Sequence, residues 1–238
     1  GTRAVPEIPA GGGGGFTNTY SLDFDGVDDY VNTGIPNLSG TDFTTSYWFK
    51  TTATFTNFTY YVPFSAVSNY GFVGAYLYNR PTELVVICKN SSGAIPRGTT
   101  NLKDGNWHHI ASTYNETTKN FKTYVDGSLE LDETIFSYAI FNQPLLLGGK
   151  SSSLNLINCF IDEAAYFTSE LTAANITDIY NSGAPANLTS LSPPAWYRMG
   201  DDATWDGSNW TLTNQGSSGV NGTSVNMTES DRVEDVPS

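Results

Sequence analysis

The chain has 238 residues, with 11 Lys and Arg against 24 Asp and Glu, which gives a formal net charge of −13 at pH 7. Nucleic-acid binding depends on Lys and Arg that neutralise phosphates, so this charge argues against DNA or RNA as a partner. No run of about 18 apolar residues occurs, and we expect no membrane insertion. The 14 Tyr and 13 Phe, with 23 Gly and 11 Pro to form turns, are typical of an all-β protein.

Residues 1–19 form the first segment of the chain. They contain Pro6, Pro9 and five consecutive glycines at 11–15. Such a composition buries too little apolar surface to offset the entropy lost on ordering. We therefore predict a flexible Gly-rich arm over 1–19, and we expect this arm to contact neighbouring protein subunits.

From residue 20 onward, apolar residues recur at every second position in short stretches that end in Gly and Asp turns. A period of two predicts strands, and the dipeptides Asp25-Gly26 and Asp126-Gly127 predict hairpin turns because these turns need positive φ. The number and spacing of the stretches predict a two-sheet antiparallel β-sandwich of the jelly-roll type. The main predicted strands are 20–24, 44–49, 71–78, 83–89, 107–114, 121–125, 144–148 and 159–167.

One stretch has helical spacing instead. It opens after Thr172, and Gly183 is well placed to end it. We predict a single short helix packed on the sandwich through one apolar face. That face would consist of Leu171, Ile176, Ile179 and Tyr180.

The chain changes character after residue 190, where Pro193 and Pro194 precede a region rich in Asn, Ser, Thr and Gly. A last strand is predicted at 196–199. We predict that 191–238 is a C-terminal tail that docks on the sandwich, or on a neighbouring subunit, through its tryptophans. The sandwich itself would occupy 20–190. The docking residues would be Trp196, Trp205 and Trp210.

Six motifs follow one another within the predicted sandwich: LDFDGVDDYV at 22–31, TTSYWFK at 44–50, DGNWHHIA at 104–111, YVDG at 124–127, LLLG at 145–148 and FIDE at 160–163. Their order and content resemble the laminin-G-like jelly rolls of the concanavalin A superfamily, over about 20–184. The tail resembles the endings of laminin-G-containing structural proteins of tailed phages, especially marine ones. This second resemblance implies a virion structural protein.

The resemblance to laminin-G-like domains also implies a structural calcium ion. Asp25 on the first turn and Asp162 on a late strand would be ligands, with the Gly26 carbonyl as a third. Asp28 and Asp29 lie close enough in sequence to contribute. Calcium takes six to eight oxygen ligands from carboxylates, carbonyls and water, and turn backbones supply such oxygens readily.

No catalytic motif is complete. Glycosidases of the superfamily use alternating carboxylates such as Glu-x-Asp-x-Glu, and retaining chemistry needs two carboxyl groups about 5–5.5 Å apart. Glu130 and Asp132 match the first two positions, but the last Glu is missing. His108 and His109 alternate to opposite faces of their strand, so we expect them to be structural. We predict that the protein is not an enzyme, with a glycosidase as the least favoured alternative.

Two binding functions remain. The first is a structural or adhesive module on a particle or cell surface, such as a virion, which forms part of an assembly and also binds surface glycans. The alternative is a free, secreted, calcium-dependent lectin. The aromatic residues at 54–61 and 70–78 are candidates for exposed side chains that bind a sugar. The alternative is that they belong to the core, as aromatic residues in strands more often do. Whether Cys88 and Cys159 form a disulfide stays open.

Overall fold

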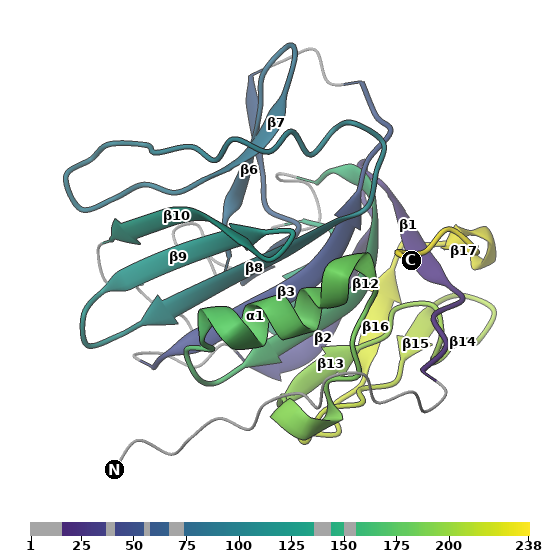
Figure 1. Cartoon of the computed structure of the whole chain (residues 1–238). Coiled ribbons are helices and arrows are strands. Elements are labelled where there is room, and N and C mark those ends of the chain that lie inside the picture. The colour runs from purple at the N-terminus through teal and green to yellow at the C-terminus, as the bar shows by residue number, and fades with distance from the viewer. Residues whose placement is uncertain (1–15, 37–40, 55–57, 67–73, 136–143, 150–155) are drawn as a thin grey trace.

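The computed structural model describes residues 16–36, 41–54, 58–66, 74–135, 144–149 and 156–238. The strands among these residues form three antiparallel sheets, and one α-helix occurs among them. Figure 1 shows the largest sheet at the centre, with the helix lying across its outer face. The predicted antiparallel β-sandwich with one short helix is confirmed.

The largest sheet has the strand order β10-β9-β8-β3-β12-β1-β17, and β13 pairs with β12. Its central strand β12 pairs with β3 along one side, while β1 and β13 share the other side. A register shift interrupts β12 between Asp162 and Ala165, and Glu163 there has a φ of +47°. The strands are β1 (Ser21–Asp25), β3 (Phe43–Lys50), β8 (His108–Asn115), β9 (Asn120–Val125), β10 (Ser128–Thr134), β12 (Asn158–Phe167), β13 (Ala195–Tyr197) and β17 (Arg232–Val233).

The second sheet has the order β14-β15-β16-β2-β11-β5, and a third, smaller sheet has the order β4-β6-β7. In Figure 1, β6 and β7 rise from the top of the sandwich. The second sheet contains β2 (Tyr30–Pro36), β5 (Phe64–Ala66), β11 (Pro144–Leu147), β14 (Ala203–Trp205), β15 (Trp210–Leu212) and β16 (Gly222–Val225). The third contains β4 (Thr59–Tyr61), β6 (Tyr76–Asn79) and β7 (Leu84–Ile87).

The main core lies between the largest sheet and the other two sheets. In strand β1 the buried side chains that belong to this core alternate with less buried ones: Leu22 and Phe24 are fully buried, whereas Asp23 between them is half-buried and Asp25 is exposed. Strand β3 is buried on both faces because the helix covers its outer side, where Trp48 stacks on Tyr180 with ring centroids 5.8 Å apart. The sandwich therefore has a second, smaller core beneath the helix.

Helix α1 (Ala173–Tyr180) begins at a capping box. The Thr172 hydroxyl accepts from the N–H of Asn175 at 3.2 Å, and the Asn175 side chain accepts from the N–H of Thr172 at 3.3 Å. Asn181, in the left-handed conformation, ends the helix before Gly183, because Asn tolerates that conformation. Gly183 falls in the 3₁₀ turn η1 (Asn181–Gly183). The predicted apolar face is buried against the sheet, with Tyr180 half-buried.

Residues 191–238 contribute strands to both large sheets. Strand β13 pairs with β12, β16 pairs with β2, and β17 pairs with β1. Trp196 and Trp210 are each 4% exposed, and Trp205 packs against the main core. The sequence pattern predicted the strand at 196–199 but none of β14 to β17. Docking of this region on a neighbouring subunit stays a prediction.

The other predicted strands match β1, β3, β7, β8, β9, β11 and β12, whereas β4, β5 and β10 were not predicted. The predicted strand 71–78 lies partly outside the described residues, which contain β6. Residues 1–15 of the predicted arm also lie outside them. Two further 3₁₀ turns are η2 (Thr189–Leu191) and η3 (Glu229–Asp231). None of the described helices combines the length and apolar character needed to cross a bilayer.

Candidate functional site

The first candidate site is the acidic turn between β1 and β2. Asp25 accepts hydrogen bonds through Oδ1 from the N–H of Val27 at 2.7 Å and of Asp28 at 3.3 Å. Asp29 is buried, and its Oδ2 accepts from the N–H of Asp25 at 3.0 Å. The three carboxylates lie within 4.8 Å of one another. Burial raises the pKa of Asp29 to about 6, and the charge of Asp25 adds to this rise against the hydrogen bond that lowers it.

The strand register separates this turn from the other predicted calcium ligand. Gly26 has a φ of +74°, and a Cβ there would come within 2.4 Å of the Asn158 nitrogen, so the turn packs directly on β12. Asp25 pairs with Asn158, and Asp162 lies four residues further along the same strand, about 13 Å away at ~3.3 Å per residue. Of the three predicted calcium ligands, Asp25 and Gly26 therefore lie on the same turn, and Asp162 lies apart from them.

The acidic turn offers the kind of oxygen donors that calcium takes, namely carboxylates beside turn carbonyls. Asp25, Asp28 and Asp29 are the residues that would hold such an ion. The sequence analysis named the last two only as contributors. Binding of calcium at the turn stays a prediction, as does the role of the Gly26 carbonyl.

Asp162 and Glu163 connect distant parts of the chain. Asp162 accepts from Nδ2 of Asn18 and from the N–H of Glu163, each at 2.8 Å. Glu163 accepts from Nε1 of Trp196 at 2.6 Å and from Nε of Arg198 at 3.1 Å. Burial raises the pKa of both carboxyl groups, and the Arg198 charge opposes this rise at Glu163. These contacts tie the residues before β1 and those of β13 to the bulge in β12.

The carboxylates that match part of a glycosidase motif also hold neighbouring segments. Glu130 accepts hydrogen bonds from the N–H of Thr99 and, at 2.6 Å, from the hydroxyl of Thr100. Asp132 accepts from Nδ2 of Asn120 at 2.7 Å. Glu130 therefore fastens the segment between β7 and β8 to the edge strand β10.

The two histidines have separate partners. The Nδ1 atom of His108 lies 2.7 Å from Asp126 and its Nε2 atom 3.1 Å from Asp104, whereas Nε2 of His109 lies 2.8 Å from Oγ of Ser46. Burial lowers the pKa of His109 to about 4, with a smaller opposing effect of Asp126. Burial also acts to lower the pKa of His108, but Asp126 and Asp104 outweigh it and raise that pKa. Both histidine rings therefore form hydrogen bonds that hold neighbouring strands and turns together.

An aromatic surface lies on the third sheet; we define it as Phe58, Tyr60, Tyr76, Tyr78 and Arg97. Among the described residues, the exposed aromatic side chains are Phe58 at 65% and Tyr60 at 41%. Tyr60 lies opposite Tyr78 in the pairing of β4 with β6, and their rings stack with centroids 4.8 Å apart. The Phe58 ring lies 6.4 Å from Tyr78, and the Tyr76 ring 6.0 Å from Tyr60. The Arg97 guanidinium lies 5.2 Å from the Tyr78 centroid.

Alternation along β6 explains why these rings gather on one side. Leu77 and Asn79 are fully buried, whereas Tyr76 and Tyr78 between them are half-buried. The sequence analysis named 54–61 and 70–78 as sources of exposed aromatic residues, and the rings of the surface come from these stretches. Residues 55–57 and 70–73 lie outside the described residues. Arg97 was not predicted as part of this surface, because no sequence pattern marks it.

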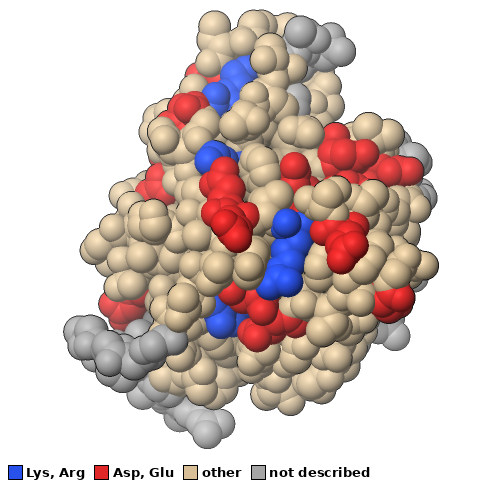
Figure 2. Space-filling view, turned by 90° about the vertical axis from the view of Figure 1, so that its right-hand side faces the viewer, with Lys and Arg blue, Asp and Glu red and all other residues tan. Residues whose placement is uncertain are grey.

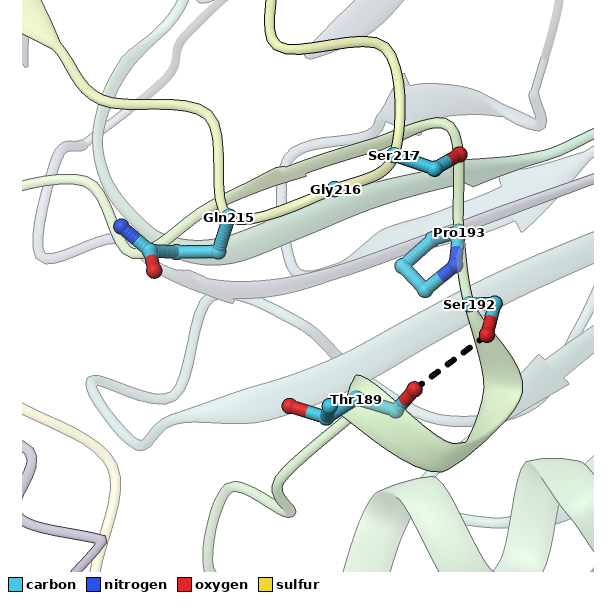
Figure 3. A pocket seen from close by; sticks show the side chains of 6 residues that line it. All are labelled: Thr189, Ser192, Pro193, Gln215, Gly216 and Ser217. Atoms are coloured by element: carbon cyan, nitrogen blue, oxygen red, sulfur yellow. Dashed lines mark hydrogen bonds between the residues drawn. The ribbon is translucent and has the colours of Figure 1, made fainter.

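A small hollow lies elsewhere, between η2 and the segment that follows β15 (Figure 3). Its volume is about 200 Å³, below the ~300–1,000 Å³ typical of small-molecule sites. Ser192 at its rim donates to the Thr189 carbonyl at 3.4 Å, as Figure 3 shows. The open aromatic surface is therefore the stronger candidate binding site. The hollow is lined by Thr189, Ser192, Pro193, Gln215, Gly216 and Ser217.

The facing antiparallel sheets place the protein in the class of jelly-roll β-sandwiches. A family model of the laminin-G type, described as the concanavalin A-like lectin/glucanases superfamily, matches residues 25–177. Because the match covers more than half of the chain, the protein belongs to this superfamily. The resemblance expected from the six motifs is confirmed, and the resemblance of the tail to phage proteins stays a prediction. No curated protein matches the sequence.

Solved structures share the fold at low sequence identity. A candidate carbohydrate-binding protein from Bacteroides ovatus ATCC 8483 has a TM-score of 0.61 and 16% identity, over 93% of this chain and 62% of that one. A heptameric SAP-like pentraxin from Limulus polyphemus has a TM-score of 0.54 and 12% identity, over 68% and 82%. The binding domain of Paraclostridial Mosquitocidal Protein 1 has a TM-score of 0.51 and 14% identity, over 82% and 55%. The chain spans less than two thirds of the length of the Bacteroides ovatus protein and of the mosquitocidal-protein domain.

Proposed function

We propose that the protein is a non-enzymatic carbohydrate-binding module whose ligand packs on the aromatic surface. The observation that carries this proposal is the exposure of Phe58 and Tyr60 beside a stacked ring, since contiguous exposed apolar side chains mark interaction sites. One face of a pyranose ring presents C–H groups, which gain dispersion contacts and leave water when they pack on an aromatic ring. The superfamily description, which names lectins and glucanases, agrees with a sugar ligand.

The proposal is for binding rather than hydrolysis because of the contacts of Glu130. Its carboxylate accepts hydrogen bonds from Thr99 and Thr100, so catalysis would require it to give up contacts that hold a loop. Hydrolysis of a β-glucan that is abolished by Glu130→Gln, in a variant with unchanged thermal stability, would contradict the proposal.

Affinity electrophoresis tests the proposal directly. The protein is run through native gels that contain soluble glucan, xylan, galactan or pectin, and its retardation gives a Kd. Tyr60→Ala and Phe58→Ala should each weaken binding about tenfold, which corresponds to ~1.4 kcal/mol lost from one packed ring. Leu129→Ala is the matched control, because Leu129 is 52% exposed on β10, outside the aromatic surface.

Two results would contradict carbohydrate binding at this surface. One is the absence of retardation by every polysaccharide in the set. The other is equal retardation of the wild type and Tyr60→Ala by a polysaccharide that does bind, since the site would then lie elsewhere. Circular dichroism confirms that each variant is folded before the comparison.

Calcium binding at the acidic turn forms a second part of the proposal, supported by three converging carboxylates. An ion there would relieve the mutual repulsion of the acids and tie the turn to the end of β1. Calcium should therefore raise the Tm, chelator should lower it, and Asp28→Asn should abolish the difference. Asp178→Asn, on helix α1, is the control. An unchanged Tm in the wild type would exclude the site.

We also propose that the module works at a particle or cell surface, as part of an assembly joined through the N-terminal arm and the C-terminal region. The Gly-rich composition of 1–15 supports this, because a segment with few apolar side chains gains little by packing on its own chain and is suited to order on binding a partner. Light scattering with and without residues 1–15 tests it. A monomer in both forms, with no binding to other surface components, would contradict it.

A further inference from the structure

We propose that the ligand is an anionic polysaccharide whose carboxylate or sulfate pairs with Arg97 while its sugar rings pack on Phe58 and Tyr60. This inference rests on the proposed function and names its substrate class. The Arg97 guanidinium lies 5.2 Å from the Tyr78 ring, which lies 4.8 Å from the Tyr60 ring, so guanidinium and Tyr60 are no more than about 10 Å apart. A short oligosaccharide can reach both.

Arg97 is exposed and available for an anion. A guanidinium beside an aromatic ring is stabilised by the ring quadrupole, and its fork of N–H groups matches the oxygens of an oxyanion. Among the described residues, the ion pairs between Lys or Arg and an acid do not include Arg97. They involve Lys50, Arg80, Lys119, Lys122 and Arg198.

The backbone around Arg97 is fixed from two sides, which limits the entropy lost on binding. Arg97 forms a β-bridge with Ile87, and the N–H of Gly98 donates to the carbonyl of Val86 at 2.8 Å. The following residues are held by Glu130 on β10. Arg97 thus stands at a defined place beside the aromatic rings.

The stretch of sequence that carries the aromatic rings and Arg97 differs in the sign of its charge from the rest of the chain. Residues 51–103, which include β4 to β7, hold four Lys and Arg and a single acid, Glu83, a net charge of +3. The remaining residues carry −16. In Figure 2, acidic side chains form several groups across the face in view, and at the upper end, where β6 and β7 lie in Figure 1, basic and acidic side chains lie next to one another. Glu130 and Glu133 contact this segment through Thr99, Thr100 and Asn90 and offset part of its charge. The excess of acids in the rest of the chain repels anions there, so a cation beside the aromatic rings favours an anion at this place.

Arg80 and Lys103 account for part of this charge but have other partners. Arg80 pairs with Glu83 at 2.6 Å. Lys103 donates to the Asn79 side chain at 3.1 Å and to the Arg80 carbonyl at 2.6 Å. Arg97 is therefore the cation of this segment that lies against the aromatic rings and has no acidic partner among the described residues.

Matched polysaccharide pairs test the inference. Polygalacturonate is compared with its methyl ester, and κ-carrageenan with uncharged agarose, by affinity electrophoresis at moderate salt. The wild type should bind the anionic member of one pair about tenfold more tightly, and the pair concerned distinguishes a carboxylate from a sulfate. Arg97→Gln should remove the preference for the anionic member. Arg80→Gln, which lowers the charge of the segment equally, should keep the preference.

The outcomes separate this inference from the proposed function. Equal binding of both members of each pair, weakened by Tyr60→Ala, would overturn the anionic ligand and keep carbohydrate binding. Binding of no polysaccharide would overturn both. Equal loss of preference in Arg97→Gln and Arg80→Gln would overturn the role of Arg97. Tighter binding of a single-stranded oligonucleotide than of any polysaccharide would overturn the assignment to sugars.

Discussion

Replacement of His109 by Gln should change how the stability of the protein depends on pH. His109 is fully buried, and its ring packs beside those of Trp48 and Tyr180, with centroids 5.3 Å and 6.2 Å away. Its Nε2 atom faces Ser46 at 2.8 Å, while its Nδ1 atom is buried without a hydrogen-bond partner among the described residues. A second proton on the ring would place a charge in a buried site where Nδ1 faces no acceptor among the described residues. Burial accordingly lowers the pKa of His109 to about 4.

The size of the effect follows from this pKa. An ordinary histidine has a pKa of 6.5, and a group whose pKa is lower in the folded protein takes up its proton more readily when unfolded. The stability that His109 contributes is therefore present above its unfolded pKa and lost as the pH falls through the folded one. A difference of one between the folded and unfolded pKa corresponds to ~1.4 kcal/mol of unfolding free energy. The stability lost through His109 between about pH 7 and pH 4 is therefore about 3 kcal/mol.

Urea unfolding of the wild type and His109→Gln at a series of pH values measures this loss. Gln keeps an amide near the position of Nε2 but does not titrate, so the stability advantage of the wild type should shrink by about 3 kcal/mol from pH 7 to pH 4. His108→Gln is the matched control, because its effect on stability should change with pH in the opposite direction. The pKa of His108 is raised by Asp126 and Asp104 against burial, so its contribution is present at low pH and lost as the pH rises. A pH-independent difference between wild type and His109→Gln would refute the reasoning.

Three further predictions concern single residues. Gly26→Ala should destabilise the protein by more than ~1 kcal/mol in urea unfolding, because the added Cβ would lie 2.4 Å from the Asn158 nitrogen at a φ of +74°; equal stability would mean that the turn does not pack on β12. Cys88 and Cys159 are free and buried, and burial raises the pKa of Cys88 to about 12, so a thiol reagent should label neither until the protein unfolds. Glu130→Ala should release the segment 98–100 to limited proteolysis, and an unchanged digestion pattern would argue against its anchoring role.

The strands that could be predicted are those whose own sequence marks one face. In β1 and β9, buried and less buried side chains alternate, and this alternation is visible without knowledge of any partner. Strands β14 to β17 have two to four residues each, too few to show a period. They are strands because they pair with each other and with β2 and β1, from which they are distant in sequence.

The candidate sites follow the same division. The acids of the turn after β1 are neighbours in sequence, so their proximity could be predicted. The separation of Asp162 from them could not, because it depends on the register between β1 and β12. The sequence also marked two aromatic stretches, but not which rings stay exposed, nor that Arg97 would lie over Tyr78.

The amino-acid sequence alone thus determined the superfamily, the antiparallel sandwich, the helix with its apolar face, and the acidic turn. The helix and the acidic turn each depend on spacing within one short stretch, which sets the side chains that share a face. The sandwich and the superfamily depend on a series of such stretches in a fixed order. Only the tertiary structure decided which faces are covered. The helix covers the outer side of β3, whereas one side of the third sheet keeps Phe58 and Tyr60 in contact with water. Packing between distant segments makes that choice, and the proposed ligand site results from it.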